Sequence, residues 1–279
     1  MKFSDWILTN GDNLQVSIFF SLLVLLAVAE RLFSRRQGPM DRPRRWTANL
    51  LLTFLNFAAL GVIPISLLTA AQWAQTHGWG LLNVIHLPLL LLIPVTLLLR
   101  GFISFFTHYL FHMVPTFWRV HRVHHLDTEF DVTTTVRFHP FEFLIGLLPG
   151  VPLVLIFGPT PWVLRLYELF DVAVTLWTHS NLRMPAYIDR YVRYVVVTPD
   201  LHRIHHSVNE SETNSNYGAV FPVWDLIFRT FNDHPKDGHD RMQTGLSEVR
   251  GNAAHRPFWL LTSVFERQLT RTSAARQEA

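Results

Sequence analysis

Long apolar runs dominate the first hundred residues of the chain. Three of them, at residues 14–33, 48–71 and 81–99, have the roughly 20 largely apolar residues that a helix needs to cross the hydrocarbon core of a bilayer. The third run ends at Arg100. The pattern therefore predicts three membrane-spanning helices in the N-terminal third of the chain.

A pair of shorter apolar runs follows at residues 143–157 and 162–177, separated by the turn sequence Gly-Pro-Thr-Pro. Each run is shorter than a comfortable span. The second run carries Arg165, Glu168 and Asp171, whose spacing of three places them near one face of a helix. Charges are costly against lipid, so we expect a tight helical hairpin packed inside the bundle, either spanning fully or re-entering.

Composition supports the membrane interpretation and excludes several classes of protein. Hydrophobic residues make up 49% of the 279 residues and charged residues only 16%, against roughly 25% charged in a soluble domain. A disordered or nucleic-acid-coating protein is therefore excluded. The absence of cysteine excludes disulfide scaffolds, thiolate zinc sites, Cys-ligated iron–sulfur clusters and cysteine nucleophiles.

Basic residues predict the orientation of the helices. The loop that follows the first predicted span is rich in arginine, whereas the loop at residues 72–80 has no Lys or Arg. The arginines concerned are Arg31, Arg35, Arg36, Arg42, Arg44 and Arg45. Because cytoplasmic loops are enriched in basic residues, we expect the first loop to be cytoplasmic. The chain after Arg100, apart from the hairpin tip near Pro159, then lies on the cytoplasmic side.

The clustered histidines are the main candidates for chemistry. Five of the 15 histidines fall within eighteen residues, and one of their two patterns recurs 81 residues downstream. The patterns are His108-x3-His112, His121-x2-His124-His125 and His202-x2-His205-His206. Offsets of three and four place side chains on one face of a helix, so each pattern directs two or three imidazoles one way. If the third span continues as a helix past Arg100, His108 lies roughly 12 Å beyond it, where all three patterns can cap the bundle.

Eight converging imidazoles fit metal binding better than acid–base catalysis, which does not need so many. One metal ion takes roughly four to six ligands, so eight histidines are enough for two metal ions. A structural zinc site has four ligands and commonly uses cysteine. A di-zinc hydrolase normally includes carboxylate ligands. A nitrogen-rich dinuclear site at a membrane face therefore favours iron that handles dioxygen, although the spacing alone leaves the metal open.

These motifs resemble those of the membrane-bound fatty acid hydroxylase and sterol desaturase superfamily. Beyond the three histidine patterns, the resemblance includes residues 198–200 and 207 around the last box, Asn-Ser-Asn-Tyr-Gly at 214–218, and the segment 224–231. It covers roughly residues 100–232 well and the first two spans only in general character. It implies an integral-membrane, non-haem di-iron enzyme with two iron ions as cofactor, for which zinc can substitute in purified protein.

The resemblance also implies a set of metal ligands. The eight motif histidines carry over directly, and His179 resembles a further ligand position ahead of the last box. Some relatives have another histidine four residues later, where this chain has Arg183, so the full ligand count is open. The predicted ligands are His108, His112, His121, His124, His125, His179, His202, His205 and His206, with no separate catalytic residue. His139 could complete the set or support it, or could be a helix-start histidine held by Glu142.

Ligating imidazoles usually donate their second N–H to a carboxylate or carbonyl, so nearby acidic and amide side chains are candidates for that role. These candidates are Asp127, Glu129, Asp131, Glu142, Asp171, Asp200 and Asn181. For most of them a solvated or capping role is an alternative, but an intramembrane carboxylate such as Asp171 needs a partner. Asp171 and Asn181 are therefore retained, with His139, as metal-site or supporting residues. Asn214, Asn216 and Tyr217 could cover the site as a loop, although turn chemistry alone explains them equally well.

The predicted fold is an all-α integral membrane protein with about three spanning helices, a short helical hairpin and a cytoplasmic histidine-rich helical cap. We expect N-terminal transmembrane helices at 1–99 and a hydroxylase-like catalytic region at 100–240 with its membrane hairpin at 143–178. A C-terminal tail at 241–279 completes the chain, with a solvated end from residue 270 onward.

The resulting functional prediction is an enzyme that uses dioxygen to hydroxylate or desaturate a C–H bond of a fatty acid, sterol or related lipid taken from the bilayer. Electrons are expected from a ferredoxin-like or cytochrome-type partner with an NAD(P)H reductase, because the chain shows no dinucleotide fingerprint and no cluster ligands. No nucleic-acid partner is expected. The alternatives are a metal-dependent hydrolase that works without dioxygen and a metal-binding transporter or scaffold. Histidines beyond the span ends count against a transporter.

Overall fold

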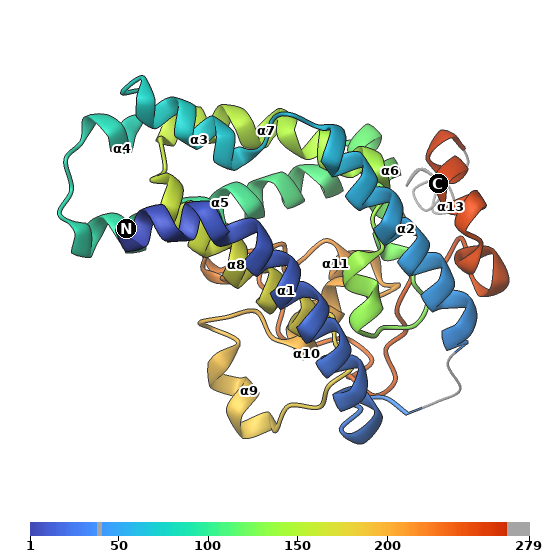
Figure 1. Ribbon diagram of the computed structural model, residues 1–279. Coiled ribbons are helices and arrows are strands. Elements are labelled where there is room, and N and C mark those ends of the chain that lie inside the picture. The colour runs from blue at the N-terminus through green and yellow to red at the C-terminus, as the bar shows by residue number, and fades with distance from the viewer. Residues whose placement is uncertain (38–40, 267–279) are drawn as a thin grey trace, which may run out of the picture.

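The computed structural model describes residues 1–37 and 41–266, and this part of the chain is helical, with three isolated β-bridges and no strand. The α-helices are α1 (Phe3–Leu32), α2 (Arg42–Val62), α3 (Leu67–Thr76), α4 (Leu81–Val84), α5 (Leu89–Met113), α6 (Pro115–His125), α7 (Pro140–Phe157), α8 (Pro161–Thr178), α9 (Ala186–Val192), α10 (Pro199–His205), α11 (Glu210–Thr213), α12 (Val223–Phe228) and α13 (Pro257–Thr262). The 3-10 helices are η1 (Val132–Val136), η2 (Gly251–His255) and η3 (Ser263–Phe265). In Figure 1, α3, α5 and α7 run alongside one another, and α1 and α2 slope away from them.

Four helical segments of the described chain are long and apolar enough to cross a membrane. Three of them are the single helices α1, α5 and α7, and the fourth is the run Arg42–Val84, which contains α2, α3 and α4. Their outer faces carry exposed apolar side chains, such as Val24 on α1, Phe54 on α2 and Leu148 on α7. These faces suit lipid contact, so the predicted all-α membrane fold is confirmed. The first arm of the hairpin, α7, is itself long and apolar enough to span, although the sequence pattern indicated two shorter arms.

The second apolar run is two helices rather than one. α2 ends at Val62 because Pro64 cannot continue the helix, and Ser66 then begins α3. The Ser66 hydroxyl accepts a hydrogen bond from the backbone N–H of Thr69 (3.1 Å), and the Thr69 hydroxyl accepts one from the Ser66 N–H (2.8 Å). The third run, predicted at 81–99, is divided as well: residues 81–84 form α4, and the spanning helix α5 begins only at Leu89, after Pro88. It continues to Met113, so His108 and His112 extend the spanning helix as expected.

The hairpin turns at Gly158, which adopts the left-handed conformation (φ +60°) that ends α7. A Cβ on this residue would lie 2.6 Å from Asn83 Nδ2, so close approach of the chain also favours glycine here. The returning helix α8 packs along α1. There Arg165 pairs with Asp12 of α1 (2.9 Å) and with Glu168 of its own helix (3.2 Å). Arg165 and Glu168 of α8 thus pair within the protein, as the hairpin prediction required.

The described part of the C-terminal segment forms a core with α2 and α6. Ala254, Leu260 and Val264 pack against Leu52 and Val123. Buried arginines fasten this segment at both ends: the Arg137 guanidinium donates to the Ala254 carbonyl, and that of Arg122 donates to the Ser263 carbonyl. The predicted solvated end at residues 270–279 lies outside the described residues.

Candidate metal centre

The end of α5 and the start of α6 bring the first two histidine patterns together. Val114 is extended and Pro115 begins α6, so the chain turns back and α6 packs on α5. The third pattern lies on α10, whose N-terminus is capped by Thr198 and followed by Pro199. His179 ends α8, which packs on α10. Four helices therefore converge on one histidine layer.

The nine predicted ligands form two groups, each with its ring nitrogens within 4.8 Å of one another. The first group is His108, His112, His121, His125 and His205, and the second is His124, His179, His202 and His206. The groups are adjacent, since the ring of His125 stacks on that of His206 with centroids 4.5 Å apart. Arg183, at the position where some relatives have another histidine, is exposed. The structure thus offers five nitrogen ligands on one side and four on the other.

Nitrogen spacing in the first group matches that around a single ion. The Nε2 atom of His121 lies 3.0 Å from that of His108 and 3.2 Å from that of His125, and the Nε2 atoms of His108 and His205 are 3.1 Å apart. Two nitrogen ligands about 2.1 Å from one ion at right angles would be about 3.0 Å apart. These distances therefore fit imidazoles that share a metal.

Outer hydrogen bonds determine which ring nitrogen of these histidines faces inward. Nδ1 of His108 donates to the Tyr217 carbonyl (2.8 Å), and Nδ1 of His205 donates to the Ser215 carbonyl (2.7 Å). Burial lowers the pKa of His205 well below its usual range, and His108 lowers it further. A neutral ring with its proton on Nδ1 has a lone pair on Nε2. The Nε2 lone pairs of His108 and His205 therefore face one another, with the two atoms 3.1 Å apart. A cation between them resolves that repulsion.

The second group has the same character. Nε2 of His179 lies 3.1 Å from that of His124 and 2.9 Å from that of His202, and Nδ1 of His179 donates to the Thr175 carbonyl (2.8 Å). Both ring nitrogens of His206 are buried without a hydrogen-bond partner among the described residues. Burial lowers the pKa of His206 well below its usual range, with neighbouring histidines adding to the effect. A buried, unpaired imidazole is unfavourable, so the donor set and its spacing fit a second metal ion.

One carboxylate supports the first group directly. Glu142, at the start of α7, places Oε1 2.6 Å from Nδ1 of His121. This contact orients the ring and leaves Nε2 facing the other histidines, which is the arrangement of a carboxylate–histidine–metal triad. Among the seven acidic and amide candidates, Glu142 thus directly contacts a predicted ligand.

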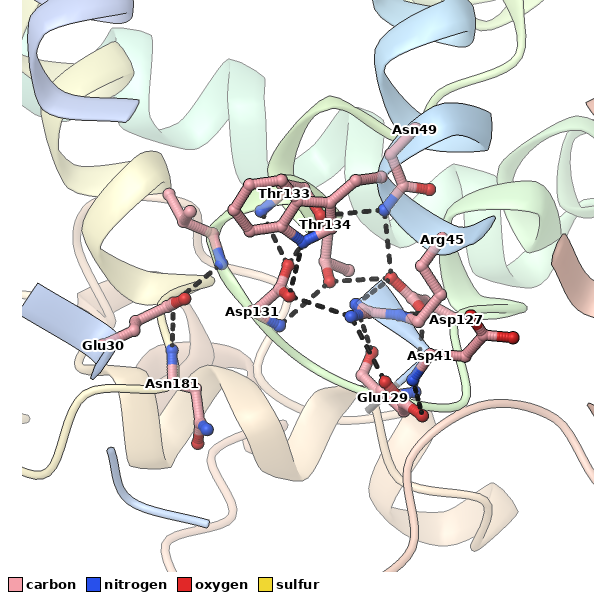
Figure 2. A network of polar contacts seen from close by, with 12 residues as sticks. Glu30, Asp41, Arg45, Asn49, Asp127, Glu129, Asp131, Thr133, Thr134 and Asn181 are labelled. Carbon is pink, nitrogen blue, oxygen red and sulfur yellow. Dashed lines mark hydrogen bonds and ion pairs between the residues drawn. The ribbon is translucent and has the colours of Figure 1, made fainter. Parts of the chain in front are cut away.

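Three other candidates lie in a separate buried network around Arg45 (Figure 2). The Arg45 guanidinium donates to both oxygens of Asp127 (2.8 and 2.9 Å), to Asp131 (2.8 Å) and to the Glu129 carbonyl (3.2 Å). Burial opposes ionisation of Asp127, but Arg45 and Arg137 outweigh it and hold the pKa of Asp127 below its usual range. The network joins α2 to the segment that directly follows α6. These carboxylates therefore help to position α6, which carries three of the predicted ligands, rather than contacting the ligands themselves.

The remaining candidates also lie away from the histidine nitrogens. Asp200 pairs with Arg35 (3.4 Å) and with Arg203. Asn181 accepts from the backbone N–H of Arg36 (3.1 Å) and donates to the carbonyl of the same residue (2.9 Å). Asp171 borders the cavity described below.

His139 lies outside both groups. It caps α7, where its Nδ1 accepts from the Phe141 N–H (3.1 Å) and its Nε2 contacts the Leu261 carbonyl (3.2 Å). The interpretation of His139 as a helix-start histidine therefore matches its position. Glu142 does not hold its side chain; instead the Glu142 N–H donates to the His139 carbonyl (2.8 Å).

Backbone carbonyls supply most of the outer contacts, which sequence reasoning did not specify. Ser215 and Tyr217 belong to the loop that the sequence singled out, and the loop is fixed by Asp225, which accepts from the N–H groups of Tyr217 and Gly218 (both 2.8 Å). Asn216 has a positive φ (54°) and bridges to Asn232. The loop therefore covers the site and directs its carbonyls at the histidines.

A cavity of about 620 Å³ leads from the histidines into the helical bundle. Five predicted ligands line its inner end: His108, His121, His124, His179 and His202. Apolar side chains such as Ile103, Phe111 and Phe138 line its walls, and the exposed residues Leu60 and Ile65 lie at its mouth between α1 and the break separating α2 from α3. An apolar chain can thus reach the histidines from the side of the bundle.

Comparison with known proteins agrees with this arrangement. The family model described as fatty acid hydroxylase matches residues 93–230. The chain is 28% identical over 230 residues to an ornithine lipid hydroxylase from Rhizobium tropici, covering 78% of this chain and 67% of that protein. It is 27% identical over 126 residues to an alkylglycerol monooxygenase from Homo sapiens (44% and 27%), and 25% identical over 227 residues to a very-long-chain aldehyde decarbonylase from Oryza sativa (78% and 33%). No solved structure is significantly similar.

The region matched by the family model contains all nine predicted ligands: His108 and His112 on α5, the α6 pattern, His179 and the α10 pattern. It also includes Glu142 and the loop whose carbonyls orient the rings. The histidine layer and its supports thus coincide with the matched region, and the chain belongs to the fatty acid hydroxylase and sterol desaturase superfamily.

Proposed function

We propose that the chain is a membrane-bound, non-haem di-iron oxidoreductase that hydroxylates or desaturates a C–H bond of a lipid. The observation that carries the proposal is the pair of adjacent all-histidine groups at the inner end of an apolar cavity. His108, His112, His121, His125 and His205 would hold one ion, and His124, His179, His202 and His206 would hold the other. Iron held in this way supplies dioxygen activation and the removal of hydrogen from an unactivated carbon.

The chain's own residues bind and orient the substrate. Phe111, Phe138, Ile103 and Leu68 are among the apolar side chains that line the cavity. These apolar contacts exclude water and favour a hydrocarbon chain. Thr175 and Glu142 fix the rings of His179 and His121, so the inward nitrogens keep their positions during turnover.

The overall reaction requires an external electron source. Hydroxylation consumes the C–H bond, one dioxygen, two electrons and two protons, and it yields an alcohol and water. Desaturation consumes two adjacent C–H bonds with the same inputs and yields an alkene and two waters. We propose a ferredoxin-like or cytochrome-type donor with an NAD(P)H reductase, acting on the cytoplasmic side to which the basic loops point.

The activities for which the relatives are named support a lipid substrate. The Rhizobium protein is an ornithine lipid hydroxylase and the human protein an alkylglycerol monooxygenase. The chain spans about two thirds of the first and about a quarter of the second. Oxidation of a lipid is the chemistry common to both names.

Turnover under isotopic dioxygen tests the proposal. Detergent-purified, iron-loaded protein would be given a membrane lipid extract, a chemical reductant and ¹⁸O₂, with zinc-loaded protein and an anaerobic sample as controls. We expect a lipid product that gains one ¹⁸O atom, or an alkene with label in water, in the iron-loaded aerobic sample alone. Product formation without dioxygen would instead indicate a hydrolase, and tight metal binding without any lipid product would indicate a scaffold or transporter.

Removal of the Glu142 carboxylate should weaken metal binding in the first group. In Glu142→Ala, Nδ1 of His121 loses its 2.6 Å acceptor, and loss of such an outer partner lowers metal affinity by about 10–100-fold. Glu142→Gln should lose less because its amide oxygen still accepts. Metal titration against a chelator measures the effect, with Glu248→Gln at an exposed position as control. Unchanged affinity in Glu142→Ala would contradict a supporting role for this carboxylate.

A further inference from the structure

The outer half of the 620 Å³ cavity is charged, which a channel for a plain hydrocarbon does not need. Arg100, Arg165, Glu168 and Asp171 line it together with the apolar wall, and Asp12 lies at its mouth. These residues come from α1, α5 and α8, at the level of the membrane-spanning helices. Charges placed there are costly unless each finds a partner.

Three of the charged residues already satisfy one another. Arg165 is buried and pairs with Asp12 (2.9 Å) and Glu168 (3.2 Å), and it also donates to Gln15 (3.1 Å). This group joins α1 to α8 and forms one side of the mouth. Its hydrogen bonds account for its presence without a ligand.

Arg100 has no such partner. The residue is 9% exposed, and its guanidinium makes no hydrogen bond or ion pair within 4.0 Å among the described residues, although Glu168 and Asp171 are near enough to interact with it electrostatically. The guanidinium lies over the ring of Tyr167, 5.0 Å from the ring centroid, and the residue borders the cavity. A guanidinium is a planar fork of donors that suits a carboxylate or phosphate, so an anionic group in the cavity would satisfy it.

Asp171 lies near Arg100 but does not pair with it within 4.0 Å. Its Oδ1 atom is buried and has no hydrogen-bond partner among the described residues. A purely anionic ligand at Arg100 would therefore meet a negative carboxylate beside it. A ligand that also carries an ammonium group would satisfy both side chains.

Helix geometry gives the distance of this pair from the histidines. Arg100 precedes His108 by eight residues on α5, and Asp171 precedes His179 by eight residues on α8. The two helices pack together and both end at the histidine layer, so they run in the same direction. At about 1.5 Å per residue, Arg100 and Asp171 lie roughly 12 Å along the helices from the histidines.

We propose that Arg100 and Asp171 form a headgroup subsite for a zwitterionic lipid, in which Arg100 binds an acidic group and Asp171 an ammonium group. The inference rests on the proposed function and specifies its substrate class. The apolar inner cavity then receives the lipid chain, and the roughly 12 Å separation places a chain carbon, rather than the headgroup, at the histidines. Both the carboxylate–ammonium and the phosphate–ammonium headgroup share this chemistry.

Lipid binding by the intact detergent-purified protein tests the subsite without turnover. Four lipids of matched chain length would be compared by native mass spectrometry: an Nα-acyl-lysine, phosphatidylethanolamine, phosphatidylglycerol and diacylglycerol. We expect at least one of the two zwitterionic lipids to be retained about tenfold more than phosphatidylglycerol or diacylglycerol. The stronger of the two identifies whether the acidic group is a carboxylate or a phosphate. Equal retention of zwitterionic, anionic and neutral lipids would overturn the inference.

Matched variants separate recognition from folding. Arg100→Gln and Asp171→Asn should each reduce retention of the zwitterionic lipid about tenfold and leave that of diacylglycerol unchanged, whereas Arg190→Gln on the exposed part of α9 should change neither. The exchange Arg100→Asp/Asp171→Arg should recover part of the zwitterion preference, because the headgroup can bind in the opposite sense. An equal loss for all four lipids in folded variants would overturn the inference.

Metal content and lipid oxidation, measured on the same samples, distinguish this inference from the proposed function. Iron-loaded protein that oxidises lipids but shows no headgroup preference would overturn the subsite and leave the oxidoreductase intact. Zwitterion-selective binding in protein without oxidising activity would support the subsite and contradict the proposed function. For a zwitterionic substrate, tandem mass spectrometry should locate the oxidised position on the chain, and oxidation on the headgroup would contradict the 12 Å separation.

Discussion

Replacement of both His121 and His205 by alanine is expected to remove one of two metal ions and to reduce lipid oxidation by more than about 100-fold. Both residues belong to the five-histidine group, so their loss leaves His108, His112 and His125 there. The loss should exceed the 10–100-fold cost of removing an outer partner, because these atoms would contact the ion itself. The four-histidine group keeps all of its members, so about one ion per chain should remain.

The complementary double variant His202→Ala/His206→Ala should lose the other ion. Elemental mass spectrometry of purified, iron-loaded protein measures both stoichiometries, and His234→Ala, at an exposed position outside both groups, is the matched control. Loss of both ions from either variant alone would show that the groups bind cooperatively as one site. Full retention of two ions in both variants would contradict the assignment of these histidines as ligands.

The histidine layer could be predicted from the sequence because helical spacing is local. His121 and His125 share a helical face by their offset of four, and so do His202 and His206, whatever the rest of the chain does. The division into two groups could not be predicted in this way. His124 and His125 are neighbours on α6, yet their nitrogens belong to different groups, because His124 meets His179 while His125 meets His205 of α10.

The supporting residues were harder to identify because carboxylates have competing partners. Asp127 and Asp131 follow the α6 histidines closely, but Arg45 of α2 lies 82 and 86 residues away from them in sequence and binds both. Backbone carbonyls, which every residue has, replaced them as outer acceptors for His108 and His205. The break between α2 and α3, which the prediction of one span at 48–71 missed, has a local cause, because Pro64 cannot continue the helix.

The Arg45 network carries the second large expected effect, on folding rather than chemistry. Arg45 and its partners Asp127 and Asp131 have fully buried side chains (0% exposed). Arg45→Met removes the cation and leaves two carboxylates buried without it, and breaking a buried ion pair in this way costs about 3–5 kcal/mol of unfolding free energy. Thermal unfolding in detergent should show a clear fall in Tm. Metal content should fall as well, since Asp127 lies two residues after His125.

Removing the charges together separates this effect from a loss of packing. The triple variant Arg45→Met/Asp127→Asn/Asp131→Asn leaves no uncompensated charge, so it should recover much of the stability that Arg45→Met alone loses. Arg44→Met, at the neighbouring position with a side chain 64% exposed, should change Tm little because surface ion pairs contribute about 0–1 kcal/mol. A triple variant as unstable as Arg45→Met would show that the arginine stabilises α2 through its contacts rather than by neutralising Asp127 and Asp131. The histidine layer would then depend on the packing of α2 against η1, and the ion pairs would be its consequence.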